Sequence, residues 1–274
     1  MSKVWFVSGS SRGLGRAVVE AALAADASVV ATARKPEQLK DLVAKHGDRV
    51  LPLALDVTDN EAVLNTVQAG LKRFGRIDVV VNNAGYGDIA AIEDVTVESF
   101  RAQMEANFFG VVFVTKAVLP ILRRQRRGHI FQVSSLGGRI GSVGLASYQS
   151  AKWAVGGFST VLSQEVAPFG IKVTVLEPAG MRTDWAGPSM TIPPISEPYQ
   201  QTVGQFAEFL RGFHGKEPSD PRKVAELMLN LADREDAPLR LLVGPDAVEY
   251  AGKAAEALAE SDRKWRDVSV STAD

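Results

Sequence analysis

The chain has 274 residues, 46% of them hydrophobic, which is enough to bury a full core in one sizeable domain. Its 31 basic and 32 acidic residues almost cancel, and this balance argues against a nucleic-acid-binding or membrane-surface protein. The chain contains no cysteine, which excludes disulfides, thiolate nucleophiles and cysteine metal sites.

The sequence also carries no clear targeting or metal-binding signal. Residues 1–7 are too short, and too soon followed by glycines, to form a signal peptide. No apolar stretch is expected to be long enough to cross a membrane, since the longest, 17–33, is interrupted by Glu20 and Asp26. The three histidines are scattered, with none beside a carboxylate cluster, so we expect no metal site. We therefore expect a cytoplasmic protein without nucleic-acid or membrane partners.

In chain order, short runs rich in β-branched residues or leucine alternate with longer segments whose apolar residues recur at helical spacing. The short runs are mostly apolar, as strands covered on both faces should be. This alternation predicts one α/β domain, a doubly wound parallel sheet of about seven strands with helices on both faces. The expected strands are Val4–Val7, Ser28–Thr32, Val50–Ala54, Ile77–Val81, His129–Ser134, Ile171–Leu176 and Leu239–Val243, and the expected helices are Leu14–Ala25, Pro36–His46, Asn60–Phe74, Phe100–Arg124, Tyr148–Ala167 and Pro221–Ala232.

A glycine-rich turn follows the first strand directly and opens the first helix. Gly9 permits the tight turn, Gly13 lets the backbone approach a pyrophosphate, and Gly15 lets the helix pack close to the strand. The exposed N–H groups at the helix start favour an anion. An ordinary turn between a strand and a helix is the alternative. The residues expected to bind a dinucleotide here are Gly9, Ser11, Arg12, Gly13, Leu14 and Gly15.

The end of the second strand bears on the choice of cofactor. NAD-selective dehydrogenases usually place a carboxylate there to bind the ribose 2′-hydroxyl, but this chain has Ala33 followed by Arg34. A guanidinium binds a 2′-phosphate with forked hydrogen bonds, and Arg12 offers a second cation. The charges favour NADP(H) over NAD(H). Alternatively, Arg34 and Lys35 are simply solvated loop charges.

Tyr148 and Lys152 are four residues apart, so both side chains emerge on one face of a helix. A nearby ammonium should lower the pKa of the phenol and make Tyr148 usable as a general acid or base. Ser135 ends the fifth strand and can donate a hydrogen bond to a substrate carbonyl. Ser134 is the competing residue, but its side chain should face the opposite side of the strand. Without this context, an exposed amphipathic pair would be the simpler interpretation of Tyr148 and Lys152.

These motifs, in this order, resemble the short-chain dehydrogenase/reductase family over about residues 3–244. The resemblance implies a Rossmann-type fold in which Ser135, Tyr148 and Lys152 are catalytic and Lys152 also holds the nicotinamide ribose. It makes Asn107 the fourth catalytic residue, in a distorted helix, where it binds a water that links Lys152 to solvent. It also implies cofactor contacts from Asp56, Val57, Asn83, Ala84, Gly85, Pro178, Gly180 and Thr183, although Ala179 displaces the usual glycine after the proline.

The segment 185–218 breaks the alternation of strands and helices with five prolines, and we expect it to be a lid over the substrate. Met181, Trp185 and Phe206 suggest an apolar pocket. We assign residues 1–246, with this lid, to one dinucleotide-binding and catalytic domain. Residues 247–274 are expected to form a helix, 247–266, and a polar tail.

The sequence therefore predicts an NADP(H)-dependent oxidoreductase that interconverts an apolar ketone or aldehyde and an alcohol. The alternatives are an NAD(H)-dependent dehydrogenase and a non-enzymatic dinucleotide-binding regulator on the same fold. An epimerase or dehydratase of the family's extended branch is disfavoured, because few residues follow Gly180 to build a substrate domain. The resemblance alone implies a homodimer or homotetramer, paired through the helices around 100–124 and 148–167.

Overall fold

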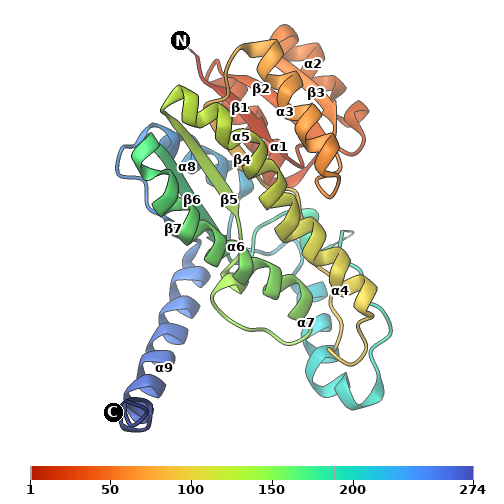
Figure 1. The fold of residues 1–274 in the computed structure, drawn as a ribbon. Helices are drawn as coiled ribbons and strands as arrows, with labels where there is room; N and C mark the ends of the chain where they lie inside the picture. Colours follow the sequence, from red (N-terminus) through yellow and green to blue (C-terminus); the bar gives the residue numbers. More distant parts are fainter. Residues whose placement is uncertain (1, 188, 274) are drawn as a thin grey trace.

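The structure, a computed structural model, describes residues 2–187 and 189–273. Within these residues, one seven-stranded parallel sheet runs through the centre in the order β3-β2-β1-β4-β5-β6-β7 (Figure 1). The predicted doubly wound sheet is confirmed, and each strand begins and ends within two residues of its expected position. The strands are β1 (Val4–Val7), β2 (Ser28–Ala33), β3 (Val50–Ala54), β4 (Val79–Asn82), β5 (Gly128–Val133), β6 (Ile171–Pro178) and β7 (Arg240–Val243).

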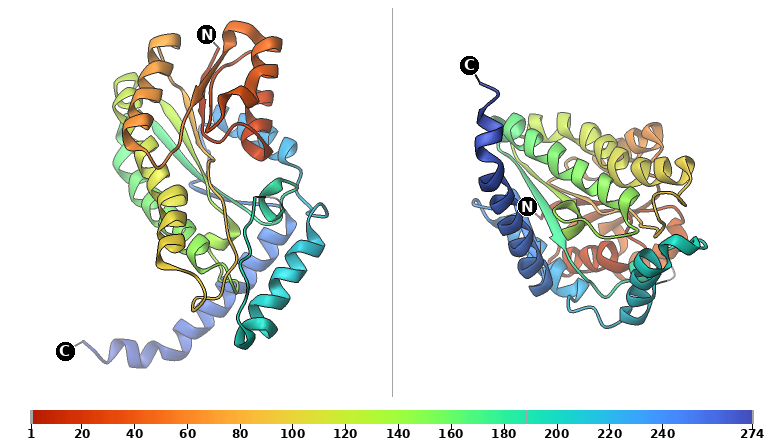
Figure 2. Two further views of the ribbon diagram at one scale, coloured as in Figure 1. Left: turned by 90° about the vertical axis from the view of Figure 1, so that its right-hand side faces the viewer. Right: turned by 90° about the horizontal axis from the view of Figure 1, so that it is seen from below.

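Helices cover both faces of the sheet (Figure 2). Because side chains alternate along a strand, Trp5 and Val7 of β1 enter one hydrophobic core and Phe6 enters the other. Helices α1 (Gly13–Ala24), α2 (Lys40–His46) and α8 (Pro221–Asp233) contribute to the first core. Helices α3 (Asn60–Phe74), α5 (Gly110–Gln125) and α6 (Ala146–Val166) contribute to the second.

The chain between β3 and β4 shows how local signals set the ends of a helix. The Asp59 carboxylate accepts hydrogen bonds from the backbone N–H groups of Glu61 and Ala62 at 2.9 and 3.0 Å, and so caps the start of α3. Gly75 ends the helix in the left-handed conformation, with φ of +74°. The cap is therefore Asp59 and not Asp56. The Asp56 side chain instead lines the cavity at the carboxyl end of the sheet.

The helix expected at Phe100–Arg124 is longer and is distorted. It begins with α4 (Val97–Met104), passes through one π-helical turn at Glu105–Phe109 and continues as α5. By length and composition the stretch 97–125 could cross a membrane, since its most apolar 18-residue window has a mean hydropathy of 1.5. The expectation that no stretch is long enough is therefore wrong. However, half of its most apolar window is buried within the fold, as in a helix that packs on a sheet.

The segment expected to be a lid carries its own helix, α7 (Gln205–Phe213). The segment packs on a third, smaller hydrophobic cluster that includes Ile89, Leu145 and Val203. The last helix, α9 (Pro245–Val270), extends four residues past the expected end and projects from the body of the molecule (Figures 1 and 2).

Candidate active site

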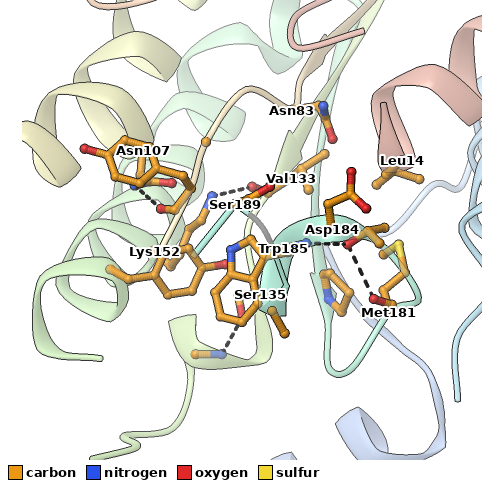
Figure 3. A pocket seen from close by; sticks show the side chains of 18 of the residues that line it. Leu14, Asn83, Asn107, Val133, Ser135, Lys152, Met181, Asp184, Trp185 and Ser189 are labelled. Carbon is orange, nitrogen blue, oxygen red and sulfur yellow. Dashed lines mark hydrogen bonds between the residues drawn. The ribbon is translucent and has the colours of Figure 1, made fainter. Parts of the chain in front are cut away.

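A cavity of about 1590 Å³ lies at the carboxyl ends of strands β1 to β6. Its walls come from loops that follow each of these strands and from the lid (Figure 3). With the exception of Gly15, every residue predicted for the site lines this cavity: Gly9, Ser11, Arg12, Gly13, Leu14, Arg34, Asp56, Val57, Asn83, Ala84, Gly85, Asn107, Ser135, Tyr148, Lys152, Pro178, Gly180 and Thr183.

The glycine turn has the geometry of an anion site. Gly9 and Gly13 have φ of +70° and +56°, values that favour glycine. Gly15 lies beneath the turn, where any Cβ would collide with the Gly9 carbonyl, so it serves close packing rather than contact with a ligand. Helix α1 begins with no side-chain cap and no acidic residue in its first turn. Its first N–H groups are therefore available to a phosphate.

Asn83 supports the turn from the neighbouring strand. Its side-chain amide donates to the carbonyls of Ser8 and Gly9 at 3.0 and 3.1 Å. The Ser8 hydroxyl in turn accepts from the backbone N–H groups of Asn83 and Ala84. The amide of Asn83 thus holds the turn in shape, while the backbone of 83–85 lines the cavity.

At the end of β2, Ala33 is buried and Arg34 is exposed, and both line the cavity. The Asp56 carboxylate accepts from the backbone N–H and the hydroxyl of Thr58 at 3.0 and 2.8 Å, forming a local turn. This end of the cavity wall therefore carries the exposed guanidinium of Arg34. It also carries the carboxylate of Asp56, which is hydrogen-bonded within its own loop.

The loop that leads into the lid meets the glycine turn directly. Arg12 Nη1 lies 3.8 Å from Asp184 Oδ2, and a Cβ on Gly13 would lie 3.4 Å from Thr183. The Thr183 hydroxyl accepts from the backbone N–H of Trp185 at 3.4 Å and begins a short helical turn. Arg12, predicted as a cofactor cation, thus links the turn to the loop before the lid.

Tyr148 and Ser135 come together from α6 and from the loop after β5. Tyr148 is 7% exposed, and it forms a hydrogen bond with Ser135 that stabilises its phenolate. The Ser135 hydroxyl also accepts from the backbone N–H of Gly137 at 3.0 Å. Ser134 is buried instead, with its hydroxyl donating to the Lys152 carbonyl at 3.3 Å. Of the two serines, Ser135 is the one bonded to Tyr148.

Burial dominates the acid–base properties of the pair. It raises the pKa of Tyr148 to about 12 and lowers the pKa of Lys152 to about 8. Lys152 Nζ donates to the Val133 carbonyl at 2.9 Å and lies 5.4 Å from the centre of the Tyr148 ring. The expectation that Lys152 lowers the pKa of Tyr148 is therefore wrong for the chain by itself. Desolvation of the phenolate outweighs the attraction of a neighbour that is itself buried.

Asn107 lies in the π-helical turn and is fully buried. Its amide N–H group donates to the carbonyls of Tyr86 and Gln103 at 2.8 and 2.9 Å, whereas its Oδ1 has no hydrogen-bond partner. A Cβ on Gly85 would lie 2.5 Å from this oxygen and 3.6 Å from Lys152 Nζ, so both atoms border the same space (Figure 3). A buried acceptor without a partner is costly, which indicates a place for a donor such as water.

Sequence reasoning missed the contact that closes the lid over Tyr148. The Trp185 ring lies against the Tyr148 ring, with centroids 5.1 Å apart. Gly87 leaves room for this pair, because its Cβ would lie 2.7 Å from Trp185 and 3.2 Å from Tyr148. The only signal in the sequence is a second glycine shortly after Gly85.

A buried ion cluster beneath the Ser135 loop was also missed. The Glu177 carboxylate is fully buried and accepts from Arg139 Nε at 2.6 Å and from Arg240 Nε at 2.8 Å. Arg240 also donates to the Gly138 carbonyl at 3.2 Å, and the Gly138 N–H donates to the Ser135 carbonyl at 2.9 Å. The cluster thus anchors the loop that carries Ser135. No sequence motif marks it, because its members come from three distant segments.

Comparison with known proteins places this site in a family. The model of the family described as short chain dehydrogenase matches residues 3–191. The oxidoreductase BOA17 of Botryotinia fuckeliana is 66% identical over 274 residues, the whole of both chains. A 3-ketodihydrosphingosine reductase of Bacteroides thetaiotaomicron is 33% identical over 89% of this chain and 88% of its own length.

Solved structures agree in fold. A short-chain dehydrogenase from Streptomyces avermitilis has a TM-score of 0.95 and 37% identity over the whole of both chains. ElxO with NADP bound has a TM-score of 0.75 and 26% identity, over 91% of this chain and 100% of its own. A 3-ketoacyl-(acyl-carrier-protein) reductase from Brucella melitensis complexed with NADH has a TM-score of 0.73 and 25% identity, over 88% of this chain and 96% of its own.

Proposed function

The chain belongs to the short chain dehydrogenase family and is an oxidoreductase that acts on CH–OH groups, and we propose that it reduces apolar ketones with NADPH. The observation that carries the proposal is the meeting of Ser135, Tyr148 and Lys152 in a cavity that also holds the glycine turn. Related structures contain NADP or NADH, so a nicotinamide dinucleotide is the cofactor of the fold.

The residues present fit such a cofactor. The uncapped N-terminus of α1 offers N–H groups to a pyrophosphate, and Gly13 keeps the approach clear of side chains. Gly85, Asn107 and Lys152 border the space assigned to the nicotinamide ribose. When bound, the dinucleotide supplies the hydride for the carbonyl carbon.

The preference for NADPH rests on charge at the end of β2. Arg34 is exposed at the cavity wall, and the buried Ala33 stands where NAD-selective dehydrogenases carry a carboxylate. Arg34 would bind a 2′-phosphate, with Arg12 as the second cation. NAD(H) remains the alternative cofactor.

Tyr148 would supply the proton in reduction. Its pKa of about 12 keeps it protonated at neutral pH, so it can donate to the oxygen as negative charge develops there. Ser135 would hold the same oxygen with a second hydrogen bond. Lys152 Nζ would hold the ribose, and Asn107 Oδ1 would accept from a water that carries protons to Lys152.

The substrate side of the cavity is apolar. Helix α7 lines it with Phe206, Phe209, Leu210 and Phe213, and Trp185 covers Tyr148. At about 1590 Å³ the cavity exceeds the roughly 300–1,000 Å³ of common ligand pockets, which leaves room for a second molecule beside a cofactor. One relative is named for an aliphatic ketone, 3-ketodihydrosphingosine, which supports an extended apolar ketone as the substrate.

The rate of ketone reduction by the Tyr148→Phe variant tests this proposal. We expect NADPH oxidation with a panel of aliphatic and aromatic ketones to fall between about 100-fold and 10,000-fold, with NADPH affinity nearly unchanged. Tyr86→Phe, another tyrosine of the same cavity, is the matched control and should retain activity. Equal turnover by Tyr148→Phe and the parent would refute the mechanism. Tight NADPH binding without turnover of any ketone by the parent would favour the non-enzymatic regulator instead.

A further inference from the structure

Gln149 directly follows Tyr148 in the first turn of α6, and only one end of its side-chain amide has a partner among the described residues. The residue is 7% exposed and lines the cavity. Its Oε1 accepts a hydrogen bond from the backbone N–H of Ser142 at 2.8 Å. This bond ties the loop that carries Ser135 to the helix that carries Tyr148. It accounts for the oxygen of the amide but not for its nitrogen.

The hydrogen bond to Ser142 fixes which end of the amide is which. A backbone N–H can only donate, so the atom that meets it must be the oxygen, and the other end is the NH₂ group. Within residues 2–187 and 189–273, this NH₂ group donates to no other residue. Unlike Oδ1 of Asn107, it is not sealed from solvent. Gln149 therefore offers a fixed and accessible donor at the cavity wall.

The free donor lies on the Ser135 side of the cavity. A Cβ on Gly137 would lie 2.9 Å from Nε2 of Gln149, and the Gly137 N–H donates to Ser135 Oγ at 3.0 Å. With ordinary bond lengths, these contacts keep Ser135 Oγ and Gln149 Nε2 within about 9 Å of each other. Two oxygens about 3 Å apart can bridge even that separation, because each hydrogen bond spans about 2.9 Å. Both oxygens can therefore belong to one substrate molecule.

The wall around this donor is apolar. Ile140 and Leu145, from the same stretch of chain, also line the cavity, and Leu145 belongs to the small hydrophobic cluster on which the lid packs. Ligand pockets are mostly apolar, and their few fixed polar groups orient the ligand. A ligand that covers the NH₂ group without accepting from it removes a hydrogen bond to water and gives none in return. The wall therefore favours a ligand with an acceptor at this point.

We propose that Gln149 is a specificity-determining residue whose NH₂ group donates to a second oxygen of the substrate. This inference rests on the function proposed above and narrows it. Tyr148 and Ser135 hold the carbonyl oxygen that is reduced, and Gln149 holds a second carbonyl oxygen two carbons along the same chain. The oxygens of such a group have the separation that the two sites require. A plain ketone would leave the NH₂ group covered and unpaired.

Two ketones of equal chain length test the substrate class. Ethyl 3-oxohexanoate carries an ester carbonyl two carbons from its ketone, whereas 4-nonanone has its ketone at the same position and no ester. An ester activates a neighbouring ketone by itself, so the informative quantity is how the ratio of the two kcat/KM values changes from parent to variant. Gln149→Glu keeps an oxygen for the Ser142 N–H but lacks the NH₂ group. We expect it to lower the ratio of ketoester to ketone about 10-fold.

Two further variants separate recognition from structure. Gln149→Met removes the NH₂ group without adding a charge, and it also removes the acceptor for the Ser142 N–H. Any shift of the Ser135 loop slows both reductions and cancels in the ratio, which should again fall about 10-fold. Ser142→Ala is the matched control, because it removes a hydroxyl from the same wall and keeps the backbone N–H. It should keep the ratio of the parent.

The possible results distinguish this inference from the function on which it rests. An active parent whose ratio is unchanged in both Gln149 variants would overturn the inference and leave the proposed function standing. A parent that reduces 4-nonanone but not ethyl 3-oxohexanoate would do the same. A parent that reduces neither compound, nor any other ketone, would overturn the proposed function and the inference with it.

Discussion

Arg12 Nη1 lies 3.8 Å from Asp184 Oδ2, and this ion pair joins the glycine turn to the loop that leads into the lid. Both side chains are about half exposed, so the pair is worth at most about 1 kcal/mol. It nevertheless places a carboxylate beside one of the two cations proposed for the 2′-phosphate. If Arg12 binds the phosphate as proposed, Asp184 competes with the cofactor for it.

Removing that competition should tighten NADPH binding. We expect Asp184→Asn to lower the Kd for NADPH by up to about 5-fold at low salt, because Arg12 is then free for the phosphate, and to leave the Kd for NADH nearly unchanged. Fluorescence titration measures both. Asp246→Asn removes another carboxylate from the cavity wall and is the control. The same gain in that variant would mean that general charge, not the ion pair, is responsible.

The proposed preference for NADP(H) should depend on the end of β2. Ala33→Asp combined with Arg34→Leu removes the cation and adds a carboxylate that repels a 2′-phosphate. We expect the ratio of kcat/KM for NADPH to that for NADH to fall at least about 100-fold, since two charge contacts change. Lys35→Leu, the neighbouring exposed cation, should leave the ratio within about 3-fold. An unchanged ratio in the double variant would show that the phosphate is bound elsewhere.

Arg240 should act as a positioning residue for Ser135. Arg240→Met removes the donor to the Gly138 carbonyl and should misplace the Ser135 loop. We expect kcat to fall between about 10-fold and 100-fold, with the Kd for NADPH unchanged. Arg234→Met, which removes an exposed arginine paired with Asp236, is the control. A variant that only loses stability, with normal kcat below its Tm, would argue against a positioning role.

His129 should make the fold sensitive to acid. It is buried between β4 and β6, with Nε2 2.9 Å from the Thr174 hydroxyl, and burial lowers its pKa from 6.5 to about 3. Because the folded pKa is lower than the unfolded one, stability is present above pH 6.5 and is lost as the pH falls toward 3. The loss from this group amounts to roughly 5 kcal/mol.

Urea unfolding at several pH values measures this effect. In His129→Gln the free energy of unfolding should fall less between pH 7 and pH 4 than in the parent. His46→Gln is the control, since His46, the last residue of α2, is only partly buried. Parallel curves for the parent and His129→Gln would contradict the assignment.

The sheet and most of its helices were predictable because burial leaves a direct pattern in the sequence. Strands such as Val79–Asn82 are apolar on both faces, and the cap of α3 at Asp59 is a local signal. The candidate site was predictable in outline for a similar reason. Its residues follow the ends of successive parallel strands, and these ends meet at one edge of the sheet.

Features that depend on distant segments were not predictable. The Glu177 cluster draws on arginines 38 and 63 residues away. The pKa of Tyr148 was misjudged because sequence spacing shows a charged neighbour but not the loss of solvent. Helix α7 was missed because the prolines before it suggest an irregular segment, although none lies within the helix and Phe206, Phe209 and Phe213 recur at helical spacing.

Gly87 gives the enzyme a simple route to a different substrate range. Its missing side chain is what allows an indole from the lid to rest on the phenol of Tyr148. A single methyl group at that position would push the indole outward and widen the entrance above the reacting oxygen. Bulkier substrates would then gain access without any change to Ser135, Tyr148 or Lys152.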